Sequence, residues 1–306
     1  MLIGLFAALS VGSPHTVLAQ EPSDSSEYRV ETSIASQSAS TGAEMYRGTD
    51  AQDVRAGYDK QAGEFDERVL GLPPIAEWEE LHEAGALEAQ TLEQIGWLYE
   101  QGHVGDQPNL EHALQWYERA AEAGLHRNAV RVAWMYLGGR GAPTSRVEAE
   151  RWLQYAIEHD HLPGHTALAS VLIADAMAGR ATERMPEAIE LLESALDRGF
   201  DTASYFLTRV YLEGLGGIEA DYAKGAEYAR MGAEAGNAQQ QGWLAFLLAE
   251  GRGVEPDLVE ALTWASLAAA DGDALGQNLR VWLEEQLPEA SVREAREAAV
   301  AWALER

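Results

Sequence analysis

Apolar and small residues recur along most of the chain at the spacing of an amphipathic helix. The stretch 251–272, GRGVEPDLVEALTWASLAAADG, shows this pattern most clearly, because Ala261, Trp264 and Ala268 share one side of the helix that it predicts. Gly272 ends that helix, since glycine adopts the left-handed conformation of a helix C-terminus at little cost. The stretch therefore predicts a loop followed by a helix that buries one side.

Four weaker copies of this stretch lie upstream. Aligned on the small residue three positions before the aromatic one, the copies match at Ala113, Ala149, Ala188, Gly225 and Ala261, which are 36, 39, 37 and 36 residues apart. Seven positions later each copy has a second small residue, where two helix backbones can approach closely: Ala120, Ala156, Ala195, Gly232 and Ala268. Eleven positions after the first small residue stand Gly124, Asp160, Gly199, Gly236 and Gly272. A repeat of this length predicts stacked helical hairpins.

A first helix precedes each of these second helices. Its core pairs are Ile95 with Tyr99, Val132 with Tyr136, Leu168 with Leu172, Leu207 with Tyr211, and Leu244 with Leu248. Glycines end the first helices, at Gly102, Gly139, Gly179, Gly214 and Gly251. Alternating runs rich in Val, Ile and Thr are missing, so the sequence favours helices throughout.

The pattern L-G-x-x-Y-x-x-G-x-G-V followed by A-x-x-W-x-x-x-A-A-x-x-G resembles the Sel-one-like repeat, a tetratricopeptide-like helical hairpin. Residues 95–99, 139–141 and 251–254 match it best, and the resemblance covers the chain from about residue 78 onward. The third copy departs most, because AMAGRATERMPEA replaces the glycine-rich loop and Leu191 replaces the aromatic residue. The resemblance implies an all-α, right-handed α-solenoid of about five helix-turn-helix repeats with N- and C-terminal capping helices.

The sequence divides into a leader, a spacer and the repeat array. The divisions are a signal peptide at 1–19, a disordered acidic and Ser-rich spacer at 20–52, an amphipathic helix or linker at 53–72, and a solenoid at 73–306 with repeats at about 88–124, 125–160, 161–199, 200–236 and 237–272 and a C-terminal cap at 273–306. The segment 53–72 either caps the first repeat or docks elsewhere. The spacer has little apolar surface to bury.

The leader is an export signal by its pattern. An apolar run at 2–9 and a breaker at Pro14 precede Val17, Leu18 and Ala19, which suit a signal peptidase, and the run is too short to span a bilayer. No basic residue precedes Arg29, which a late start codon or an uncleaved anchor would explain equally well. The prediction is a periplasmic or secreted protein.

Charge and cysteine content exclude several classes of function. The 50 acidic residues outnumber the 22 basic ones, which gives a formal charge of −28. Such a surface repels nucleic acid and anionic lipid, so we expect no nucleic-acid partner and no membrane insertion after leader cleavage. The chain has no cysteine, which rules out disulfides, thiolate metal sites and thiol catalysis.

The candidate binding residues lie on the first helices. A residue two positions after the core Ile or Leu points about 200° away from it, toward the groove that solenoids use for binding. The predicted partner-binding groove contains Trp97, Arg127, Arg131, Trp134, Arg209 and Phe246. The alternative is that Trp97 and Trp134 pack against a neighbouring helix and that the arginines pair with nearby glutamates.

The sequence contains no recognisable catalytic or cofactor-binding motif, so it predicts a protein that is not an enzyme. His159, His161 and His165, with Asp160, have a spacing that could hold zinc or nickel, although solvated histidines in a turn explain it as well. We expect an exported repeat scaffold whose partner is another envelope protein or peptide segment. The alternative is a metal-binding or hydrolytic envelope accessory protein that uses these histidines.

Overall fold

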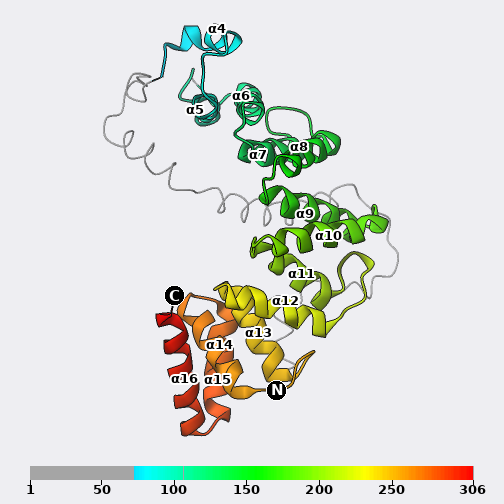
Figure 1. Cartoon of the computed structure of the whole chain (residues 1–306), viewed down its shortest axis with the longest axis vertical. Coiled ribbons are helices and arrows are strands. Elements are labelled where there is room, and N and C mark those ends of the chain that lie inside the picture. Colours follow the sequence, from blue (N-terminus) through cyan, green and yellow to red (C-terminus); the bar gives the residue numbers. More distant parts are fainter. Residues whose placement is uncertain (1–71, 106, 306) are drawn as a thin grey trace, which may run out of the picture. The chain divides into compact units, whose positions relative to one another are not determined.

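The structure, a computed structural model, describes residues 72–105 and 107–305, all of which belong to one compact unit. Within these residues the chain is helical and contains no β-strand (Figure 1). The predictions for the leader, the spacer and the segment 53–71 lie outside the described residues. The all-α solenoid that the repeats predict is confirmed by the helices that are described.

Six helical hairpins follow one another after a short N-terminal element. That element is η2 (Ile75–Glu77) with α4 (Trp78–Glu83). The first helices are α5 (Ala89–Gln101), α7 (Arg127–Leu137), α9 (Pro163–Met177), α11 (Thr202–Glu213), α13 (Ala238–Glu250) and α15 (Ala274–Gln286). Their second helices are α6 (Leu110–Glu122), α8 (Arg146–Glu158), α10 (Met185–Asp197), α12 (Tyr222–Glu234), α14 (Leu258–Ala270) and α16 (Glu289–Leu304). Short 3₁₀ turns, η3 (Thr182–Arg184) and η4 (Leu215–Gly217), lie inside two of the hairpins.

Polar side chains start the second helices and left-handed residues stop the helices. Asn109, Ser145, Asp221 and Asp257 accept hydrogen bonds from backbone N–H groups in the first turns of α6, α8, α12 and α14. The predicted stop positions all have positive φ: Gly102, Gly124, Gly139, Gly179, Gly199, Gly214, Gly236, Gly251, Gly272 and also Asp160, whose φ is 66°. Local sequence thus sets the helix ends.

The small residues at matched positions are buried where helices cross. Ala113, Ala149, Ala188 and Ala261 have no exposed surface, and Gly225 is buried too. A Cβ atom added at Gly232 would lie 2.6 Å from both Ser204 Oγ and Gln240 Cγ. The close approach of the helices therefore depends on side chains no larger than a methyl group, and at Gly232 on the absence of any side chain.

The aromatic residues of the second helices fill the spaces between hairpins. Trp116 and Trp152 are buried, and the Trp78 ring meets Trp116 edge-on with centroids 6.5 Å apart. At the other end of the array, Trp264 meets Trp302 of α16 edge-on at 5.7 Å. Neighbouring hairpins are thus joined by apolar packing, which is the dominant stabilising contact in a repeat array.

The third hairpin, whose loop departs from the repeat pattern, forms by a different set of contacts. Ala181 takes a left-handed conformation with φ 48° before η3. The buried Asp175 carboxylate forms ion pairs with two arginines. Its Oδ2 atom lies 2.7 Å from Arg146 Nε, and its Oδ1 atom lies 3.0 Å from Arg180 Nε. Because Arg146 belongs to α8 and Asp175 to α9, this ion pair also joins the second hairpin to the third.

The C-terminal segment forms a sixth hairpin. Leu279 and Leu283 of α15 and Ala295 and Ala299 of α16 are buried in the same cluster as α13 and α14. None of the described helices combines the length and apolar character that a membrane crossing needs.

Candidate interaction surface

The first helices of successive hairpins lie against one another. Helix α9 contacts both α7 and α11, and α13 contacts α15. Arg127 of α7 forms an ion pair with Glu93 of α5, and the Tyr205 ring of α11 stacks on Trp243 of α13. We name one surface of the array the first-helix face. It consists of the sides of the first helices that face away from the second helices, on α5, α7, α9, α11, α13 and α15.

The residues two positions after the core residues of the first helices are partly exposed. Trp97, Trp134, Ser170, Arg209 and Phe246 are each neither buried nor fully exposed, whereas the core residue two positions earlier is buried in every copy. The helical geometry that placed these side chains on the first-helix face is therefore consistent with their exposure. Whether they contact a partner stays a prediction.

Trp97 is engaged with its own hairpin as well. Its ring lies 5.2 Å from the His103 ring, centroid to centroid, and it packs against the cluster that contains Ile95 and Leu98. Burial lowers the pKa of His103. Part of the Trp97 ring surface is therefore used for packing within its own hairpin, as the alternative interpretation stated.

The predicted arginines are engaged by neighbouring side chains. Arg127 Nε donates to Glu93 Oε1 at 3.1 Å. Arg209 binds both oxygens of Glu213, at 2.8 and 3.1 Å, and these hydrogen bonds raise the pKa of Arg209. The first-helix face therefore carries arginine side chains whose charge is balanced within the molecule.

Arg131 makes a different contact. Its guanidinium lies over the Tyr117 ring, 4.5 Å from the ring centroid, in a cation–π arrangement. The Tyr117 hydroxyl donates to Glu100 Oε2 at 2.7 Å, and burial raises the pKa of that hydroxyl. Arg131 is half-buried, and it packs against Tyr117 in the preceding hairpin.

Two further aromatic residues belong to this surface and were missed in the sequence. The rings of Tyr205 and Trp243 are stacked, with centroids 5.7 Å apart and planes 13° from parallel, and both are half-buried. Arg209 lies 6.0 Å from the Tyr205 ring centroid, and Phe246 is one turn from Trp243 on α13. The available signal was an aromatic residue shortly before each core leucine, because Tyr205 lies two positions before Leu207 and Trp243 lies one position before Leu244. Tyr205, Trp243 and Phe246 thus form an aromatic group on the first-helix face.

The three predicted metal-ligating histidines do not converge. His159 lies against Tyr155, with ring centroids 4.1 Å apart and planes tilted by 35°, whereas His165 is buried in α9 with 5% of its surface exposed. Across residues 72–105 and 107–305, no three histidine, cysteine or carboxylate side chains come together in a way that could hold a metal ion. The geometry therefore gives the alternative metal site no support.

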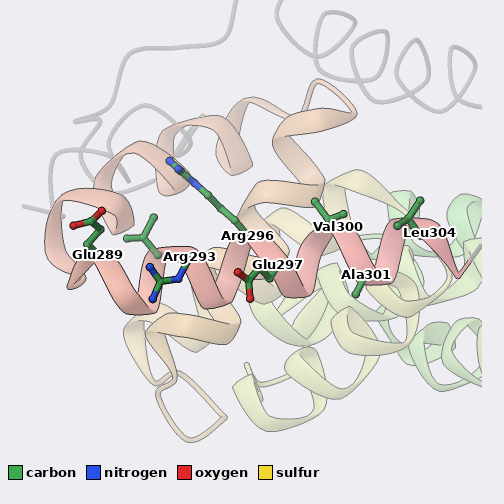
Figure 2. A pocket seen from close by; sticks show the side chains of 8 residues that line it. Glu289, Arg293, Arg296, Glu297, Val300, Ala301 and Leu304 are labelled. Carbon is green, nitrogen blue, oxygen red and sulfur yellow. The ribbon is translucent and has the colours of Figure 1, made fainter.

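A surface hollow lies along the outer side of α16. Its described lining comes from this helix alone, including Arg293, Glu297, Val300 and Leu304, as Figure 2 shows. Val300 and Leu304 are largely exposed. The hollow is thus one side of a terminal helix, and it holds no arrangement of acid, base and nucleophile.

Comparisons with known proteins fit this architecture. A model of the Sel1 repeat matches residues 90–125, 129–161, 202–237 and 241–273, which leaves the third and sixth hairpins unmatched. The structure resembles a protective antigen of uropathogenic Escherichia coli with an SLR fold (TM-score 0.60, 24% identity, 74% of this chain). It also resembles a Sel1 repeat protein from Oxalobacter formigenes (TM-score 0.52, 27% identity, 72% of this chain and 94% of that one). The chain spans about half of the Escherichia coli protein, 47% of its length. No curated protein matches the chain significantly.

Proposed function

Because the chain belongs to the Sel1-like repeat family, whose members are protein-interaction scaffolds, we propose that it is a non-enzymatic exported scaffold that binds another envelope protein or peptide segment. Binding takes place on the first-helix face. The observation that carries this proposal is the half-exposed aromatic group of Tyr205, Trp243 and Phe246, which spans two hairpins.

Aromatic residues at such a place suit binding. Large rings contribute much contact area at low entropic cost, and they are enriched among the residues that dominate binding energy. Because the Tyr205–Trp243 stack is already formed, ordering these rings costs a partner little free energy. Arg209, whose charge is balanced by Glu213, lies 6.0 Å from the centroid of the Tyr205 ring and provides a hydrogen-bond donor beside the aromatic group.

The first test is capture of a partner from a cell-envelope fraction. We expect the double variant Tyr205→Ala and Trp243→Ala to weaken capture at least about ten-fold, since aromatic anchors dominate such interfaces. The matched control is Met231→Ala with Val147→Ala, which shortens two exposed apolar side chains on second helices. Equal capture by both variants, each with an unchanged helical circular dichroism spectrum, would contradict the proposal.

Export is the second part of the proposal, and the sequence of the leader supports it. Cells that express the full chain are fractionated, and the N-terminus of the purified protein is determined by mass spectrometry. We expect the protein in the periplasmic or secreted fraction with Gln20 as its first residue. Recovery of the uncut chain with cytoplasmic markers would argue against export and would leave the binding proposal to its own test.

A further inference from the structure

Half of the chain's eight histidines lie where the α7–α8 hairpin meets α9. His126 immediately precedes α7, His159 immediately follows α8, His161 lies in the connection to α9, and His165 is in the first turn of α9. Helix α9 contacts both α7 and α8, so these side chains lie at the junction between the second and third hairpins. We name this group the histidine junction.

Two of the rings are stacked on each other. The centroids of His126 and His159 are 4.3 Å apart, and their planes are 26° from parallel. His159 Nδ1 lies 2.8 Å from the Tyr155 carbonyl oxygen, to which it can donate as a neutral ring. His126 Nδ1 is buried without a hydrogen-bond partner. Protonation of both rings would place two positive charges in contact and add a buried donor without an acceptor.

The other two histidines have surroundings that also favour the neutral ring. His165 is 5% exposed, and its buried Nδ1 atom makes no hydrogen bond of normal geometry, although the Leu162 backbone acts to raise the pKa of this ring. Burial, and then Arg198, lower the pKa of His165. Burial, followed by His126 and Arg127, lowers the pKa of His161, and burial followed by His159 lowers that of His126.

The neighbouring carboxylates do little to offset a gain of positive charge. The charged groups near the histidine junction include the ion pairs Arg127–Glu93 and Arg198–Asp160 and the carboxylate of Glu122, which raises the pKa of the adjoining Tyr155. The first two carboxylates are already bound to arginine. Asp160 raises the pKa of His165, but burial and Arg198 act more strongly in the opposite direction.

We propose that the histidine junction is a proton-sensitive contact that loosens on acidification and separates the second hairpin from the third. The folded junction favours neutral imidazoles, so the open form binds protons more tightly. Its stability is therefore fully present above the ordinary histidine pKa of about 6.5 and is lost as the pH falls from that value through the lowered folded pKa. Because each repeat is held only by its neighbours, opening at one junction divides the array there.

Hydrogen exchange of the full chain at pH 7.5 and pH 5.5, corrected for intrinsic exchange rates and performed with EDTA, tests this proposal. We expect protection of the backbone amides of α7 and α9 to fall about five-fold or more relative to α13 and α14. Helices α13 and α14 serve as an internal control, since no histidine follows His165 in the sequence. Equal changes in the two regions would overturn the proposal.

Variants connect the effect to the named side chains. The double variant His126→Gln and His159→Gln should lose at least half of the pH dependence in α7 and α9, and His126→Gln alone serves if the double variant does not fold. His112→Gln is the matched control, because His112 is exposed on α6, outside the histidine junction. Retention of the full pH dependence in the junction variants would show that other groups cause it and would contradict the proposal.

Discussion

At the scale of single residues, the second glycine of two glycine-rich loops allows successive hairpins to stack closely. A Cβ atom at Gly141 would lie 2.2 Å from the carbonyl oxygen of Leu110, at the start of α6. The equivalent atom at Gly253 would lie 2.1 Å from the carbonyl oxygen of Tyr222, at the start of α12. Both loops therefore rest on the backbone of the preceding hairpin, which a side chain would push away.

The substitution Gly253→Ala should lower the free energy of unfolding by about 2–5 kcal/mol. Left-handed geometry costs an L-residue about 1–2 kcal/mol, and the clash with Tyr222 adds an overpacking cost of about 1–3 kcal/mol. Gly272→Ala is the matched control, since Gly272 has φ +88° but no atom within 4 Å of the added Cβ. It should cost only the first of these amounts. Urea denaturation measures both, and equal losses would show that the loop contact is unimportant.

At the scale of helices and hairpins, the sequence predicted the features that recur in every repeat, but it did not predict contacts that occur in one hairpin alone. Small residues such as Ala120 and stop residues such as Gly124 predicted the helix crossings and ends, because local geometry allows few alternatives there. The third hairpin forms although its loop lacks the glycine pattern. Its Asp175 contacts Arg146 of the previous hairpin, a contact between distant residues that no local pattern indicates.

The candidate surface was predictable only in part for the same reason. A helical wheel places Trp97, Trp134 and Phe246 away from the core, and their partial exposure agrees with that placement. It does not fix how neighbouring first helices are positioned side by side. The stack of Tyr205 on Trp243 depends on that lateral position, so it emerged only from the structure.

At the scale of the whole molecule, an acidic chain is held together with few basic residues. Arginines bridge neighbouring hairpins in the pairs Arg127–Glu93, Arg184–Glu150 and Arg198–Asp160, and Arg119 joins the first hairpin to Glu79 of α4. Each pair is at least partly exposed and worth at most about 1 kcal/mol, so apolar burial between hairpins supplies most of the stability. Many arginines thus serve the array itself, and the rings of the first-helix face supply the contact area for a partner.

The most direct test of this account is site-specific photocrosslinking in cells, with a photoreactive amino acid in place of one residue at a time. Replacement of Trp243 or Trp134 on first helices should yield a crosslinked partner of the same mass at both positions. Replacement of Val147 or Met231 on second helices, both well exposed, should yield none. Crosslinks from the second-helix positions in the absence of any from Trp243 and Trp134 would place the binding surface on the opposite side and contradict the account.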